Sequence, residues 1–108
     1  MGKSHIGAFE HLVLLALIRL GDQAYGMRVR QEIEQKGGRP VSIGAVYTTL
    51  DRLEGKGLVS SFLGDPTPQR GGRAKRYFEI TTSGVEAVRE SRSTLSRLGG
   101  LTPRESTP

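Results

Sequence analysis

Two stretches of the sequence carry side chains suited to contact with a polyanion. The first runs from Ser42 to Arg52 and combines small residues, hydroxyl groups and a guanidinium, which can bond base edges and phosphates in a DNA groove. The second, residues 64–76, places basic side chains among glycines and prolines, and arginine suits a narrow minor groove. The candidate DNA contacts are Ser42, Gly44, Tyr47, Thr48, Thr49, Arg52, Arg70, Arg73 and Lys75.

The elements expected to position these residues are three helices, a hairpin and a last helix. Helical spacing of apolar residues, with glycines ending each run, predicts helices over 9–20, 25–36 and 42–56, the third capped by Ser42. Strands are predicted over 58–63 and 76–80, and Thr81 or Thr82 can cap a helix that runs to Leu98. The expected fold is mainly α with a small β-hairpin, a winged helix-turn-helix whose third helix and basic wing tip share one side.

The first helix is apolar on nearly every side, and such a helix must be covered all round. One face can meet the core and another a second subunit, although a wholly buried central helix is the alternative. We expect residues 1–80 to form the DNA-binding domain, 81–98 a dimerisation helix and 99–108 a flexible tail. The residues expected in a homodimer interface are Phe9, Leu12, Val13, Val88, Leu95 and Leu98.

Composition narrows the function classes. The 108 residues suffice for one domain, and the net charge of +5 with a pI near 10.1 favours a polyanionic partner. The absence of cysteine excludes disulfides, thiolate metal sites and cysteine nucleophiles. No apolar run is long enough to span a bilayer and no signal peptide is evident, so a cytoplasmic location without a membrane partner is expected.

Catalysis is not expected from this sequence. His5 and His11 are six residues apart, which does not place them on one helical face as a metal-binding pair. Gly71 and Gly72 do not make a phosphate-binding loop of the Walker type, which needs Gly-Lys-Ser/Thr at the start of a helix. We therefore expect no enzyme activity, no metal and no cofactor.

Three motifs, in matching order and spacing, resemble the PadR family of bacterial transcriptional regulators. They are Tyr25-Gly26 at the start of the second helix, the run from Gly44 to Val59, and the run from Gly72 to Gly84. The resemblance covers roughly residues 6–98. It implies a winged-helix homodimer that represses transcription from a palindromic promoter site, with a single C-terminal helix packed against the partner's first helix. It also implies DNA contacts from Tyr47 and its neighbours, and from Arg73 and Lys75 on the wing.

The sequence departs from the family pattern at several points. Thr48 stands where many members have proline, and Gly84 leaves the last helix without the acidic partner of a capping box. The chain has no tryptophan, so it lacks the residue on which some short members stack flat aromatic drugs. A small-molecule effector is therefore not identified by the sequence.

Two other functions fit parts of the sequence. A winged helix can serve as a module for protein or RNA contact, with the basic wing as an ordinary surface. That interpretation predicts an apolar exposed patch on the third helix, whereas the residues there are small and polar. Peripheral membrane binding needs a helix that is basic on one face and apolar on the other, and neither of the first two helices has that pattern.

Overall fold

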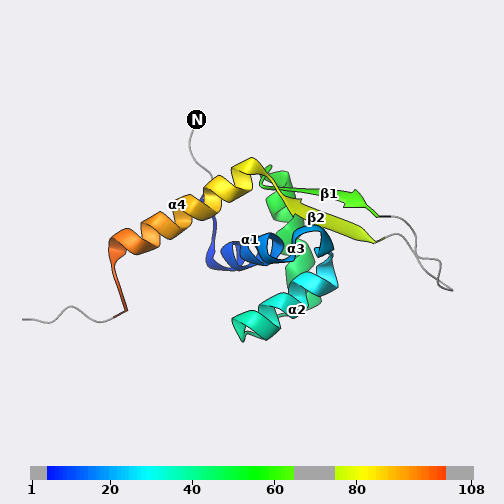
Figure 1. The fold of residues 1–108 in the computed structure, drawn as a ribbon, viewed down its shortest axis with the longest axis horizontal. Helices are drawn as coiled ribbons and strands as arrows, with labels where there is room; N and C mark the ends of the chain where they lie inside the picture. Colours follow the sequence, from blue (N-terminus) through cyan, green and yellow to red (C-terminus); the bar gives the residue numbers. More distant parts are fainter. Residues whose placement is uncertain (1–4, 65–74, 102–108) are drawn as a thin grey trace, which may run out of the picture.

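The elements of the structure follow the predicted order. The structure is a computed structural model that describes residues 5–64 and 75–101. Within these residues the elements are α1 (Ala8–Leu20), a 3₁₀ turn η1 (Gly21–Gln23), α2 (Gly26–Gly37), α3 (Ile43–Gly55), β1 (Val59–Leu63), β2 (Arg76–Ile80) and α4 (Thr82–Leu98). The mainly α winged-helix architecture with a two-stranded hairpin is confirmed (Figure 1).

The helix boundaries differ from the predicted ones by about one residue. Tyr25 and Ser42, predicted as the first helical residues, are caps with extended backbone. Ser42 caps α3 as predicted, because its Oγ accepts a hydrogen bond from the N–H of Ala45 at 3.1 Å. Lys56 likewise follows α3 instead of ending it. A sequence pattern places a helix end to within one or two residues, because the residues that flank a helix can continue its pattern without belonging to it.

α1 is the central element of the fold. It packs against α2, α3, α4 and β2, which accounts for its buried apolar side chains (Figure 1). Val13, Leu14 and Leu17 are almost completely buried, whereas Ile18 on the same helix is 46% exposed. The buried apolar core consists of Val13, Leu14, Ala16, Leu17, Ala24, Val29, Ile33, Val46, Leu50, Leu53, Leu58, Val59, Phe78, Ala87 and Val88.

The hairpin is joined to the start of α2. β1 and β2 are antiparallel, with Val59 opposite Ile80 and Leu63 opposite Arg76. The N–H of Phe78 donates to the carbonyl of Ala24 at 2.8 Å, and Tyr25 forms an isolated bridge with Tyr77. The chain just before α2 therefore extends the sheet by one short segment, which fixes the wing beside the helix-turn-helix unit. The sequence pattern did not indicate this pairing.

α4 begins in a tight junction and then leaves the body of the protein. Thr81 caps it by accepting from the N–H of Gly84 at 3.0 Å, and donates to the carbonyl of Gly57 at 2.8 Å. A Cβ on Gly84 would come well under 3.0 Å from the carbonyl oxygen of Leu58. A capping-box acid does not fit at this position, which accounts for the departure seen in the sequence. The far half of α4 projects away from the other helices, opposite to the hairpin (Figure 1).

Candidate nucleic-acid interface

The outer face of α3 is small and polar. Gly44, Thr48 and Arg52, spaced four residues apart, are all exposed, as are Ser42 at the cap and Asp51. The opposite face carries Val46, Leu50 and Leu53, which are fully buried. At 100° per residue these two sets fall on opposite sides of the helix. α3 is thus held to the core by one side, and on the other it presents small and polar side chains with the ring of Tyr47 at the edge.

Thr49 does not belong to this surface. The sequence suggests a DNA contact because its hydroxyl suits a base edge, but the side chain is only 3% exposed. It follows Val46 by three residues and precedes Leu53 by four, so it lies on the buried side of the helix. The expectation that Thr49 contacts DNA is corrected accordingly. Its residue type suggested such a contact, but its position on the helix turns the side chain toward the core.

Tyr47 lies at the edge of the exposed face, 38% exposed. Its ring is tilted at 58° to that of Phe78, with the centroids 6.4 Å apart. Its other neighbour is Gly26, the first residue of α2, since a Cβ built there would overlap the phenol end of the ring. Tyr47 therefore reaches from α3 toward the start of α2, with its phenol end against Gly26.

Arg52 and Lys56 share one carboxylate at the C-terminal end of α3. The Glu10 carboxylate, 5% exposed, accepts from Lys56 Nζ at 3.1 and 2.9 Å and lies 3.8 Å from Arg52 Nη1. Burial of Glu10 opposes its ionisation, but the N–H of Gly7, Lys56 and Arg52 together hold its pKa below the ordinary value. The Arg52 side chain is still 53% exposed, so it lies within reach of a ligand on the outer face.

Arg76 contacts α3, although its side chain remains 42% exposed. The sequence groups it with the basic residues of the wing, but it donates from Nη2 to Glu54 Oε1 at 2.6 Å and from Nη1 to Asp51 Oδ1 at 3.3 Å. Its Nε donates to Ser61 Oγ at 3.2 Å. The guanidinium thus offsets the charge of two carboxylates of α3, and it links the wing to that helix.

Of the three wing cations expected to contact DNA, the structure describes Lys75. Arg70 and Arg73 lie outside the described residues. Lys75 is exposed, with Nζ 4.1 Å from the centroid of the Tyr25 ring. Tyr77 packs edge-on against Tyr25 and stacks with Phe62 at a centroid separation of 5.7 Å. These aromatic supports were not predicted, because no local spacing relates Tyr25 to residues fifty positions later.

The residues expected in a dimer interface fall into two groups. Leu95 and Leu98 on the projecting half of α4 are 59% and 83% exposed, and Phe9 and Leu12 are half-buried. Val13 and Val88, by contrast, are 0% and 5% exposed within one chain. These two are corrected to core residues, because the same apolar character that suggested an interface serves the packing of α1 against α4.

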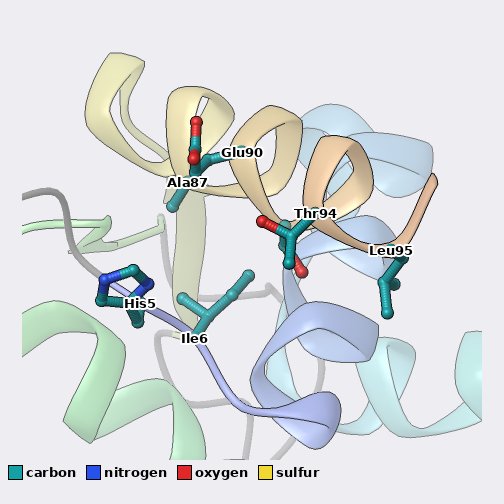
Figure 2. A pocket seen from close by; sticks show the side chains of 7 residues that line it. His5, Ile6, Ala87, Glu90, Thr94 and Leu95 are labelled. Carbon is teal, nitrogen blue, oxygen red and sulfur yellow. The ribbon is translucent and has the colours of Figure 1, made fainter. Parts of the chain in front are cut away.

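A hollow of about 200 Å³ lies between α4 and the segment that precedes α1. Figure 2 shows His5 and Ile6 on one side of it and Ala87, Glu90, Thr94 and Leu95 on the other. It is smaller than most pockets that enclose a drug-sized ligand. Nearby, His11 Nδ1 is 2.8 Å from Ser91 Oγ, and burial together with the charge of Arg92 lowers the pKa of His11.

Comparison with known proteins decides the family. The model of the transcriptional regulator PadR-like family matches residues 14–90, which is most of the chain. The chain belongs to the PadR-like family of transcriptional regulators. It is 38% identical over 79 residues to the transcriptional regulator Rv3488 of Mycobacterium tuberculosis, across 71% of this chain and 67% of that protein.

Solved structures of transcriptional regulators share the fold. A PadR family transcriptional regulator from Eggerthella lenta superimposes with a TM-score of 0.67 at 26% identity, covering 81% of this chain and 73% of that one. A transcriptional regulator from Clostridium thermocellum gives a TM-score of 0.70 at 23% identity, covering 82% and 83%. These structures confirm the winged-helix fold, and the family model over residues 14–90 confirms the family.

Among the described residues there is neither a membrane-spanning helix nor a metal-binding cluster. None of the helices in residues 5–64 and 75–101 is long and apolar enough to cross a membrane. Across the same residues, no group of three or more histidine and acidic side chains is placed to hold a metal ion. The PadR-like assignment itself names a regulator of transcription.

Proposed function

We propose that this PadR-like regulator binds double-stranded DNA as a homodimer and represses transcription from a palindromic promoter site. The observation that carries the proposal is the exposed, small and polar face of α3, with Gly44, Thr48 and Arg52 four residues apart. Such a face fits closely into a major groove, where hydroxyl and guanidinium groups bond base edges. Ser42 and the Tyr47 hydroxyl are assigned to phosphates, and Lys75, with Arg70 and Arg73, to the wing contact.

The alternative, a winged-helix module for protein or RNA contact, fits α3 less well. A protein-docking helix would present an apolar patch, whereas the large exposed ring on α3 is that of Tyr47, which carries a hydroxyl group. The other exposed large apolar side chains of the described residues lie on other elements. Those most exposed are Leu63 at the end of β1 and Leu95, Leu98 and Leu101 at the far end of the chain. A DNA-reading role for α3 is therefore the better account.

The dimer part of the proposal is supported by α4. The far half of α4 projects from the body of the protein (Figure 1). Leu95 and Leu98 on this half are largely exposed, so the packing of a single chain does not bury them. We assign residues 1–80 to DNA binding, 81–98 to dimerisation through the partner's α1, and 99–108 to a tail. The two α3 helices then enter successive major grooves about one turn apart. We assign such a protein to the cytoplasm.

The test is selection of a random duplex library on the purified protein, at physiological salt with excess competitor DNA. We expect an enriched inverted repeat with half-site centres about 10 base pairs apart. A promoter carrying that repeat should then be transcribed less in vitro as the protein is added. Absence of enrichment, with only weak salt-sensitive retention, would contradict DNA reading and favour the protein- or RNA-contact alternative.

Thr48→Ala and Arg52→Ala connect that result to α3. Each should cost about 1–3 kcal/mol of binding free energy and relax the selected sequence at one position of each half-site. Ser93→Ala, at an exposed position of α4, is the control and should select the wild-type repeat. Unchanged affinity and unchanged selection in both α3 variants would remove this helix from the assigned role.

A further inference from the structure

The ring of Tyr47 lies against a residue that has no side chain. Gly26 is the first residue of α2 and is buried, and a Cβ built on it would come 2.7 Å from Cε1 of Tyr47 and nearer still to Cζ and Oη. Real Cβ atoms do not approach other atoms so closely. The phenol end of Tyr47 therefore occupies the space that any other residue at position 26 would need.

Gly26 and Phe78 together determine where the Tyr47 ring lies. Gly26 comes from α2 and Phe78 from β2, and the Phe78 ring is fully packed in the core at 1% exposure. Both elements belong to the packed body of the protein, since α2 packs on both α3 and β2. The ring thus lies against two elements other than its own, although it is 38% exposed.

We propose that Gly26 is a positioning residue for DNA binding: its missing side chain seats the Tyr47 ring and so directs the Tyr47 hydroxyl at a backbone phosphate. This inference rests on the proposed function, because the phosphate belongs to the DNA assigned to α3. Gly26 itself makes no contact with the DNA through a side chain. It acts through Tyr47, and its effect should vanish when Tyr47 is removed.

A glycine can be needed for positioning a side chain or for the fold itself. The atom that an added Cβ would meet distinguishes these two roles. At Gly26 the obstacle is the far end of a rotatable side chain, which can swing into solvent. At Gly84 the obstacle is a backbone carbonyl, which cannot move without shifting the chain that leads into β1. Alanine is also a better helix former than glycine. Gly26→Ala should therefore keep the wild-type melting temperature to within a few degrees and lose the ring orientation.

The first measurement concerns the free protein. A nuclear Overhauser effect between the Gly26 α protons and the Tyr47 ring protons is expected in the wild type, and the Tyr47 ring resonances should shift in Gly26→Ala. Absence of that effect in the wild type overturns the inference whatever the protein binds. Loss of folding in Gly26→Ala also overturns it, because glycine would then be required for structure.

The second measurement is affinity for a duplex carrying the selected repeat. Gly26→Ala and Tyr47→Ala should each weaken binding about tenfold, the size of one charge-assisted hydrogen bond, and the double variant should bind no worse than Tyr47→Ala alone. Gly55→Ala in α3 is the matched control, since a Cβ there meets nothing within 4 Å, and it should bind within about twofold of wild type.

Two outcomes separate this inference from the function on which it rests. If Gly26→Ala weakens binding equally with and without the Tyr47 ring, the positioning role is wrong while DNA binding stands. If the wild type shows the Overhauser effect but binds no duplex, the proposed function is wrong. The ring shift in Gly26→Ala then decides by itself whether Gly26 seats the ring.

Discussion

The carboxylate of Glu10 near the start of α1 accepts two hydrogen bonds from Nζ of Lys56, at 3.1 and 2.9 Å, just beyond the end of α3. The same carboxylate accepts from the N–H of Gly7 at 2.8 Å. The buried Glu10 carboxylate therefore caps the start of α1 and links it to the end of α3, the helix proposed to contact DNA. An ion pair with one member 5% exposed is costly to break from one side, since the remaining charge is left without a partner.

Glu10→Gln should lower the free energy of unfolding at pH 7 by about 1–3 kcal/mol, because a neutral amide binds Lys56 and the Gly7 N–H more weakly. The folded-state pKa of Glu10 is lowered, so its contribution is present above the ordinary pKa of 4.5 and is lost as pH falls through the folded value. Denaturant unfolding between pH 7 and pH 3 measures both effects. Glu86→Gln, at an exposed position of α4, is the control. Equal losses of unfolding free energy in the two variants would contradict the role assigned to Glu10.

Arg76→Ala should weaken DNA binding about fivefold, or about 1 kcal/mol, although Arg76 is not assigned a DNA contact. The loss arises because Asp51 and Glu54 keep their negative charges beside the phosphates. Adding Asp51→Asn should recover part of the affinity in Arg76→Ala but not in Lys75→Ala. Fluorescence anisotropy with a labelled duplex measures the affinity of Arg76→Ala and Lys75→Ala, each with and without Asp51→Asn. No recovery in the Arg76 background would show that Arg76 contacts DNA directly.

Lys75→Ala should flatten the dependence of binding on salt. Each phosphate that the protein no longer neutralises reduces the slope of log K against log salt by roughly 0.9. Titrations at several salt concentrations give this slope, and Arg73→Ala provides a second test on the same wing. Lys36→Ala is the control: this lysine is exposed at the end of α2 and is not assigned to the interface. A slope unchanged in both wing variants would place the wing away from DNA.

Leu95→Glu combined with Leu98→Glu should convert the dimer to a monomer. Both side chains are largely exposed in one chain, so the change costs little folding free energy but places two charges in the proposed interface. Sedimentation equilibrium at micromolar concentration measures the change in mass. Ser93→Glu, on the opposite side of α4, should stay dimeric. A wild-type monomer under these conditions would contradict the proposed homodimer.

Gly84→Ala should destabilise the fold by about 1–3 kcal/mol, because the added Cβ would press on the Leu58 carbonyl. Thermal unfolding followed by circular dichroism measures the loss. Gly55→Ala makes the same substitution in open space and should melt at or above the wild-type temperature. Similar behaviour of the two variants would mean that the start of α4 adapts easily.

Local patterns predicted the elements well because each one has its own signal. The apolar face of α3, the Ser42 cap and the glycines that end the helices follow from rules spanning four or five residues, and the structure matches them. The resemblance to PadR proteins came from motifs of the same local kind, and the family match over residues 14–90 confirms it.

The misassigned residues depended on longer-range packing. Thr49 is polar yet faces the core, and Val13 and Val88 are apolar for the core of one chain rather than for a partner. Arg76 resembles a free wing charge in the sequence because its partners Asp51 and Glu54 lie more than twenty residues away. Residue type indicates what a side chain can do, whereas its neighbours in space decide what remains available.

The pairing of Arg76 with Asp51 and Glu54 has a consequence for the transfer of α3 to other proteins. A recognition helix moved alone onto a foreign winged helix would bring two carboxylates without the guanidinium that balances them. The smallest exchangeable unit is therefore the helix together with the strand that carries Arg76. Regulators recombined at the boundary between α3 and the hairpin should lose affinity even where every base-reading side chain is retained.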